Sequence, residues 1–287
     1  MAITKTFLLA GATGQVGSIV ARNLVGSDHQ VRALVRDPDA AAAKLGPGIE
    51  YVRGDLDDPG TLPEAFKGVD AAYLATAPAP AMVRQESSFI DAALAAGLPR
   101  LVELGVLGTD VSVPIFKYHQ DIEAKIASSG VPATVLRPCG FFSSLLFAAD
   151  GIRAGVLPSA AGVGRLAWID HADVADVASA VLLDAGYNGQ VLEMTGPHAL
   201  SYDNAAAALE QALGKPVAHL RIEEGALREQ MTSAGMPDWL SGSFLGQHRL
   251  MREGRLSLVT SVVADILGRP PRSLSEWLAD NKDAFGV

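Results

Sequence analysis

Three evenly spaced glycines are the first residues of the chain whose pattern suggests chemistry. Gly11, Gly14 and Gly17 lie in GATGQVG, between the apolar run FLLA and a stretch with helical periodicity. Glycine lets a strand-to-helix turn tighten, and it lets main-chain N–H groups approach a pyrophosphate at the positive end of the helix. The spacing is a variant of the G-x-G-x-x-G fingerprint of dinucleotide sites. We expect this loop to bind a dinucleotide through Gly11, Thr13, Gly14, Gln15, Val16 and Gly17.

The end of the second expected strand bears on which dinucleotide is bound. It reads Val35-Arg36-Asp37-Pro38. A carboxylate at this position accepts hydrogen bonds from the ribose 2′-hydroxyl of NAD(H), whereas the planar guanidinium of Arg36 suits a 2′-phosphate. We therefore expect NADP(H) as the cofactor, and Asp37 keeps NAD(H) open as the alternative.

Residues after the third and fourth expected strands complete the expected cofactor site. Asp55 is placed to face the adenine amino group, and Leu56 to pack on the ring. An aspartate here is also typical of an Asx turn or a helix N-cap. Ala75, Thr76 and Ala77 are small residues at a point where the backbone must pass close to the cofactor.

Short apolar runs alternate with longer helical stretches, which predicts βαβ units in a doubly wound, mostly parallel Rossmann sheet. We expect six strands, at Thr4–Leu9, Gln30–Val35, Ile49–Arg53, Ala71–Ala75, Arg100–Leu104 and Ala133–Arg137. Helices are expected at Val16–Leu24, Ala81–Ala96, Ile115–Ser128, Phe141–Ala154, Val174–Leu183 and Leu274–Asp283. Residues 1–155 are expected to form the dinucleotide-binding domain. Residues 156–287 are expected to complete the core and form a small, mainly helical substrate lobe within one structural unit.

Composition narrows the class of protein. Of 287 residues, 49% are hydrophobic and 19% charged, which is typical of a folded globular chain. The net charge of −9, without a long Lys/Arg cluster, argues against nucleic-acid binding. The first apolar stretch is shorter than the roughly 20 residues that span a membrane. Cys139 is the single cysteine, so no intrachain disulfide or thiolate metal site can form, and we expect it to be a small buried side chain. We therefore expect a cytoplasmic monomer or homodimer that acts on a small-molecule substrate, with no metal and no membrane partner.

Two later stretches, ASSGVPATVLRP (127–138) and WIDHADVA (168–175), add to the glycine loop. Together they make the chain resemble the NmrA-like atypical short-chain dehydrogenases, and within that group the NADPH-dependent quinone and triphenylmethane reductases. The motifs extend from Ile3 to about Pro197. Asp170 and Asp173, in the second stretch, are expected to cap the following helix and to complement its dipole.

The chain departs from the wider superfamily in its catalytic residues. Short-chain dehydrogenases usually place a serine at the end of strand five and a Tyr-x-x-x-Lys pair on the next helix. Counting back from the SGVP motif puts Ile115 at the tyrosine position and His119 at the lysine position, and strand five ends at Gly105 without a serine. Losing that proton shuttle costs alcohol oxidation about 10²–10⁴-fold.

Quinones, cationic dyes and conjugated electrophiles need less proton assistance, because they take a hydride directly. The resemblance therefore implies an NADPH-dependent reductase of such acceptors. Two alternatives stay open: a non-catalytic NADP(H) sensor that binds a regulatory partner, and a biosynthetic imine or enone reductase.

The expected catalytic residues lie on the helix after strand five. The resemblance implies that His119 lies near the nicotinamide ribose, where it would bind the cofactor or relay a proton. A structural pair with Glu123, one helical turn away, is the alternative. Tyr118 is a second proton-donor candidate, although it points about 100° away from His119.

The exit from strand six is expected at the edge where open α/β sheets bind ligands. Pro138, Gly140 and Phe141 are expected to contact the cofactor. Phe141 and Phe142 are expected to wall a flat substrate, with Trp168 opposite. Ordinary core packing of these aromatic rings is the alternative.

Overall fold

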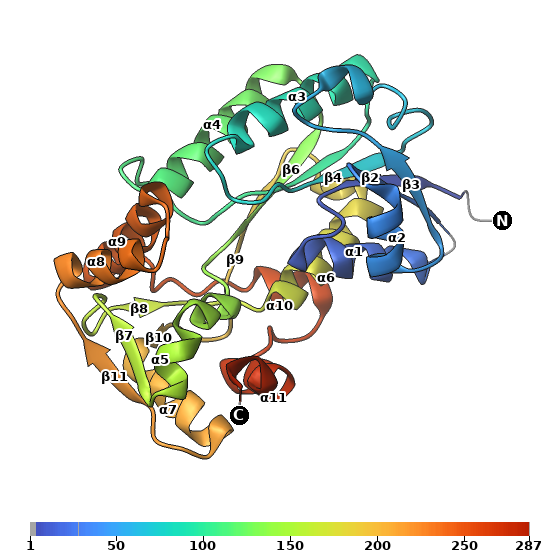
Figure 1. Ribbon diagram of the computed structural model, residues 1–287. Coiled ribbons are helices and arrows are strands. Elements are labelled where there is room, and N and C mark those ends of the chain that lie inside the picture. The colour runs from blue at the N-terminus through green and yellow to red at the C-terminus, as the bar shows by residue number, and fades with distance from the viewer. Residues whose placement is uncertain (1–3, 28, 287) are drawn as a thin grey trace. The chain divides into compact units, whose positions relative to one another are not determined.

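Seven strands form one sheet with the order β3-β2-β1-β4-β5-β6-β9 in the computed structural model, which describes residues 4–27 and 29–286 (Figure 1). They are β1 (Thr6–Ala10), β2 (Gln30–Val35), β3 (Ile49–Arg53), β4 (Ala71–Leu74), β5 (Leu101–Leu104), β6 (Ala133–Pro138) and β9 (Val191–Met194). Strands β1 to β6 pair in parallel, and the strand order reverses between β3 and β4. This confirms the doubly wound Rossmann sheet. The sequence pattern does not reveal β9, the seventh strand.

The chain folds into two compact units that alternate along the sequence. The first contains the residues up to Gly105, then Tyr118–Arg137 and Val174–Leu192. The second contains Val106–Lys117, Pro138–Asp173 and the residues from Glu193 onward. The sequence pattern instead suggests a single boundary near residue 155.

Helices cover both faces of the sheet in the first unit. They are α1 (Gln15–Val25), α2 (Pro38–Leu45), α3 (Met82–Ala95), α4 (Pro114–Ser129) and α6 (His171–Leu183), with 3₁₀ turns η1 (Pro59–Thr61) and η3 (Ala185–Tyr187). Helices α3 and α4 lie on one face, and α1 and α6 lie on the other (Figure 1). Asn23 on α1 donates a hydrogen bond to Asp176 on α6 at 3.0 Å. Consecutive residues of β1, Phe7, Leu8 and Leu9, are 0% exposed, as a sheet covered on both faces requires.

The second unit combines short strands with helices around its own core. Its elements are η2 (Phe142–Ala148), α5 (Ala149–Arg153), β7 (Val156–Ser159), β8 (Arg165–Leu166), β10 (Leu200–Ser201), α7 (Tyr202–Leu213), β11 (Ala218–Arg221), α8 (Glu224–Ser233), α9 (Asp238–Arg252), α10 (Val262–Leu267), α11 (Leu274–Asn281) and η4 (Lys282–Phe285). Strand β7 pairs with β11 in parallel, and β8 pairs with β10 antiparallel. The helix expected at Phe141–Ala154 is instead the 3₁₀ segment η2 followed by the short helix α5.

Candidate functional site

The glycine loop leaves no room for side chains at two of its positions. Gly11 has a φ of +87°, a conformation that favours glycine, and a Cβ there would lie 2.2 Å from the carbonyl oxygen of Ala75. A Cβ on Gly17 would lie 2.1 Å from the carbonyl oxygen of Gly11. The loop, the start of α1 and the end of β4 are therefore in direct backbone contact.

Helix α1 begins at this loop without a side-chain cap. Gly14 is the residue before its first turn, and the Gly14 N–H donates to the carbonyl oxygen of Gly11 at 2.9 Å. The first turn carries no acidic side chain. An uncapped helix start with no competing carboxylate, beside glycines that permit close approach, fits the pyrophosphate of a dinucleotide.

The two candidates for the ribose contact at the end of β2 have different surroundings. Oδ1 of Asp37 accepts hydrogen bonds from the N–H groups of Asp39 and Ala40, both at 3.1 Å, and so caps α2. Arg36 is exposed, and its carbonyl oxygen accepts a hydrogen bond from Arg53. Since the Asp37 carboxylate is engaged by the helix, the Arg36 guanidinium is the better placed group for a ribose substituent.

Asp55 makes local contacts after β3. Its Oδ1 accepts a hydrogen bond from the Asp57 N–H at 2.9 Å, and its own N–H donates to Oγ1 of Thr61 at 2.9 Å. Asp55 and Leu56 are both half-buried. These are the contacts of an Asx turn, and the adenine contact of both residues stays a prediction.

Thr76, at the exit of β4, is held by a carboxylate that the sequence pattern does not single out. Its N–H and its hydroxyl both donate to Oε1 of Glu86 on α3, at 3.1 and 2.7 Å. Glu86 is 0% exposed, and burial, with a contribution from Glu103, raises its pKa to about 8. The segment Ala75 to Ala77 is thus anchored from inside the first unit.

A second buried carboxyl group lies next to His119. Glu103 on β5 is 0% exposed, and neither of its carboxyl oxygens has a hydrogen-bond partner. Nδ1 of His119 lies 3.6 Å from Oε1 of Glu103 and also lacks a hydrogen bond. Sequence reasoning missed Glu86 and Glu103. The available signal was an acidic residue inside the apolar strand LVEL and another on the apolar side of α3.

The pair of His119 with Glu123 does not form. Glu123 instead binds Arg137 of β6 through both carboxyl oxygens, with Nε to Oε1 at 2.9 Å and Nη2 to Oε2 at 2.5 Å. Tyr118, the neighbouring candidate on α4, is half-buried. His119 on α4 therefore faces Glu103 on strand β5, while Glu123 is paired with Arg137.

Two of the aromatic side chains expected to contact substrate belong to the core of the second unit. Phe142 and Trp168 are each 1% exposed. Their rings pack against Trp277 and Tyr202, with centroid separations of 6.1 and 5.3 Å. Phe141 is half-buried. Phe142 and Trp168 therefore pack in the core, as the alternative interpretation expected. Of the three rings, Phe141 alone keeps appreciable exposed surface.

The segment after β6 is closely packed. Pro138 and Cys139 are buried, which confirms the interpretation of Cys139 as a small buried side chain, and burial raises the pKa of its thiol to about 12. A Cβ on Gly140 would lie 2.9 Å from Cδ2 of Leu166. Glycine therefore lets this exit segment lie against β8.

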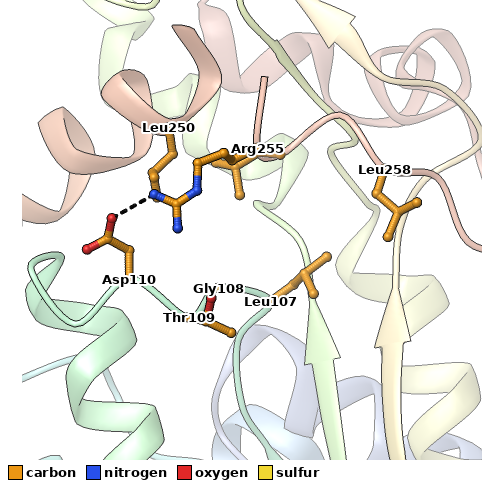
Figure 2. Close-up of a pocket in the computed structure, with 8 residues that line it drawn as sticks. Leu107, Gly108, Thr109, Asp110, Leu250, Arg255 and Leu258 are labelled. Atoms are coloured by element: carbon orange, nitrogen blue, oxygen red, sulfur yellow. Dashed lines mark hydrogen bonds and ion pairs between the residues drawn. The ribbon is translucent and has the colours of Figure 1, made fainter. Parts of the chain in front are cut away.

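A small cleft lies within the second unit (Figure 2). Its apolar lining comes from Leu107, Leu250, Leu256 and Leu258. Beside these, Nη1 of Arg255 and Oδ2 of Asp110 form an ion pair at 2.9 Å (Figure 2). The cleft encloses about 130 Å³, less than the roughly 300–1,000 Å³ of ordinary ligand sites. We assign no ligand to it.

The sequence matches the NmrA-like family over residues 3–278. The chain belongs to this family. Among its relatives, an NAD(P)H azoreductase of Xenophilus azovorans is 34% identical, over 98% of this chain and 99% of the azoreductase. The (4-alkanoyl-5-oxo-2,5-dihydrofuran-3-yl)methyl phosphate reductase of Streptomyces griseus is also 34% identical, over 97% of this chain and 98% of that enzyme.

A solved structure has the same fold as this chain. It is the NADPH-dependent quinone oxidoreductase of Escherichia coli complexed with NADPH, 29% identical in sequence. The TM-score is 0.88, and the match covers 96% of this chain and 99% of that one. The family membership expected from the glycine loop and the later motifs is thereby confirmed.

The described part of this NmrA-like chain contains neither a membrane-spanning helix nor a metal cluster. Between residues 4 and 286, leaving out residue 28, no helix combines the length and apolar character that crossing a membrane demands. Over the same residues, His, Cys, Asp and Glu side chains do not gather in threes in a way that would hold a metal ion.

Proposed function

We propose that this NmrA-like protein is an NADPH-dependent reductase that delivers a hydride directly to quinone-like or other conjugated small-molecule acceptors. The observation that carries the proposal is the combination of a glycine cradle for a dinucleotide with the residues Ile115 and His119. A dehydrogenase that polarises a carbonyl through Tyr and Lys would need those residue types there. This chain has the glycine loop that would bind the cofactor, but it lacks the Tyr and Lys residues of that proton shuttle.

The first unit supplies groups that fit NADPH. Bound NADPH supplies a hydride. Gly11, Gly14 and Gly17, with the uncapped start of α1, would hold the pyrophosphate, since their backbone has no competing side chain. Arg36 would pair with the 2′-phosphate. Thr76, anchored by Glu86, would support the cofactor from the end of β4.

The relatives support the class of acceptor. Quinones and azo compounds, named for two of these proteins, both accept a hydride at an electron-poor conjugated group. The 5-oxo-2,5-dihydrofuran of the third is an unsaturated lactone, which is also a conjugated electrophile. We propose Phe141 as the aromatic contact for such an acceptor and His119, with Tyr118 as the alternative, as its proton donor. Pro138 and Gly140 stay proposed cofactor contacts.

The test is NADPH oxidation, followed by absorbance, against a panel of quinones, azo dyes, triarylmethyl dyes, enones and imines. We expect turnover with at least one quinone or dye, and a preference for NADPH over NADH. Tight NADP(H) binding without turnover of any acceptor would favour a sensor instead. Turnover confined to enones or imines would favour a biosynthetic reductase.

A further inference from the structure

Glu103 and His119 form an isolated acid and base pair inside the first unit. The Glu103 side chain is 0% exposed and that of His119 is 10% exposed. Oε1 of Glu103 faces Nδ1 of His119 at 3.6 Å, slightly beyond hydrogen-bonding distance, and neither atom has another partner. Buried polar groups without partners are rare and call for an explanation.

The groups around this pair favour a protonated carboxyl. Burial raises the pKa of Glu103 well above its ordinary value, and the charge of Glu123 adds to the rise while Arg137 opposes it. Glu86 also faces the pair, and Glu103 in turn raises the pKa of Glu86 and of the buried phenol of Tyr73.

Burial has the opposite effect on the histidine. It lowers the pKa of His119, although the charges of Glu86 and Glu123 act in the other direction. Both shifts favour the uncharged forms, a carboxylic acid beside a neutral imidazole. This is the protonation state in which the acid can donate a proton and Nδ1 can accept one.

We propose that Glu103 is an internal proton reservoir for His119, so that the two residues supply the proton that a quinone or azo acceptor takes up after the hydride. The proposal rests on the proposed reductase function. Glu103 is a positioning and supply residue in it, because it acts through His119.

A quinone that receives a hydride gains two electrons and one proton and becomes an anion on oxygen. His119 gives its Nε2 proton to that oxygen while Nδ1 takes the proton of Glu103, so the imidazole stays neutral and Glu103 becomes a carboxylate. Before the next turnover, Nε2 takes a proton from solvent and Nδ1 returns its proton to Glu103, which restores the carboxylic acid and the starting tautomer of His119. A triarylmethyl cation needs no such proton, because hydride addition neutralises it.

This difference gives the test. Glu103→Gln keeps the size of the side chain and removes the transferable proton. In Glu103→Gln we expect turnover of a quinone to fall by about tenfold or more, since general acid catalysis contributes about 10²–10⁴-fold. We expect turnover of a triarylmethyl cation to change by less than about twofold. Glu50→Gln is the matched control, since Glu50 lies on strand β3 with its side chain 55% exposed. We expect Glu50→Gln to leave both rates unchanged.

Equal losses of turnover with both acceptors in Glu103→Gln, or no loss with either, would overturn the proposal that Glu103 is a proton reservoir. If the parent protein reduced neither acceptor, the proposed reductase function would fail and the reservoir with it. Infrared spectroscopy of the protein without cofactor gives a separate readout. At neutral pH we expect protonated-carboxyl absorption that loses one component in Glu103→Gln, while the component of Glu86 remains, and that is unchanged in Glu50→Gln. An unchanged band in Glu103→Gln would contradict a protonated Glu103 even if the folded variant were inactive.

Discussion

Oε1 of Glu86 accepts two hydrogen bonds from Thr76, one from its main-chain N–H at 3.1 Å and one from its hydroxyl at 2.7 Å. A buried side chain of α3 thereby fixes the exit of β4, where the carbonyl oxygen of Ala75 meets Gly11. The geometry of the cofactor loop thus depends on a residue that faces away from solvent. This dependence leads to the first prediction.

Glu86→Ala should weaken both folding and NADPH binding. It leaves two donors of Thr76 without an acceptor, and each buried unsatisfied donor costs roughly 1–3 kcal/mol. Urea unfolding should show a lower free energy of unfolding, and fluorescence titration a higher Kd for NADPH. Glu86→Gln keeps Oε1 and should retain most of the affinity. Equal Kd values in the parent and in Glu86→Ala would contradict the anchoring role.

Gly17→Ala should abolish tight NADPH binding. Its Cβ would lie 2.1 Å from the carbonyl oxygen of Gly11, so the loop must move, and overpacking of this kind costs roughly 1–3 kcal/mol. Gly26→Ala is the control at the end of α1, where the nearest atom lies 3.6 Å from the added Cβ. Calorimetric titration should find binding intact in Gly26→Ala. Intact binding in Gly17→Ala would show that the loop is not the pyrophosphate site.

Arg36→Asp should change the cofactor preference. Removing a charge-assisted contact to a phosphate costs roughly 1.5–3 kcal/mol, about a 10- to 100-fold rise in the Kd for NADPH. The Kd for NADH should change little. Arg22→Asp makes the same charge reversal at an exposed position on α1 and should affect neither cofactor selectively. An equal loss for NADPH and NADH in Arg36→Asp would argue against a 2′-phosphate contact.

His248 should make the stability of the protein depend on pH. Burial, with a contribution from Arg252, lowers its pKa to about 4. Its Nε2 lies 2.8 Å from Oη of Tyr202, and its Nδ1 accepts a hydrogen bond from the Ala160 N–H at 3.4 Å, so the folded state holds a neutral ring.

Unfolding releases the ring to titrate at its ordinary pKa of about 6.5. Between about pH 4 and pH 6.5 the unfolded chain therefore binds more protons, and the contribution of His248 to stability rises with pH by roughly 3 kcal/mol. The difference in unfolding free energy between parent and His248→Gln, measured in urea at several pH values, should show this slope. His198→Gln, at an exposed position, controls for the loss of a histidine from the chain. A difference that stays flat with pH would refute the neutral buried ring.

The sheet was predictable from sequence because its signals are local. Short β-rich runs bounded by turn residues mark strands, and the predicted bounds of the strands at Gln30 and Ile49 match β2 and β3. Strand β9 contains a charged residue, Glu193. Residues 138–173 of the second unit and most of helix α6 separate it in sequence from β6. Its partner β6 lies more than fifty residues earlier, and no local pattern reports such pairing.

The site was predictable only in part, because sequence signals are local and several of its contacts are not. The glycines of the loop are required by a local turn. The residues that face Glu103 and bind Asp173 come instead from other segments of the chain. Asp173 was expected to act with Asp170 as a cap and dipole partner of α6, and its buried carboxylate also binds Arg269 and Arg272, almost one hundred residues later. Contacts of this kind arise from the fold and leave no spacing in the sequence.

The central claim is direct hydride transfer from NADPH to a conjugated acceptor, and single-turnover kinetics test it most directly. NADPH carrying deuterium at the transferring C4 position is mixed with the protein and a quinone, and the loss of NADPH absorbance is followed with time. Direct transfer predicts a slower decay than with unlabelled NADPH. With a triarylmethyl cation in place of the quinone, it also predicts deuterium on the central carbon of the reduced dye, because that C–D bond does not exchange with water. A decay at the uncatalysed rate, with NADPH nevertheless bound tightly, would contradict it.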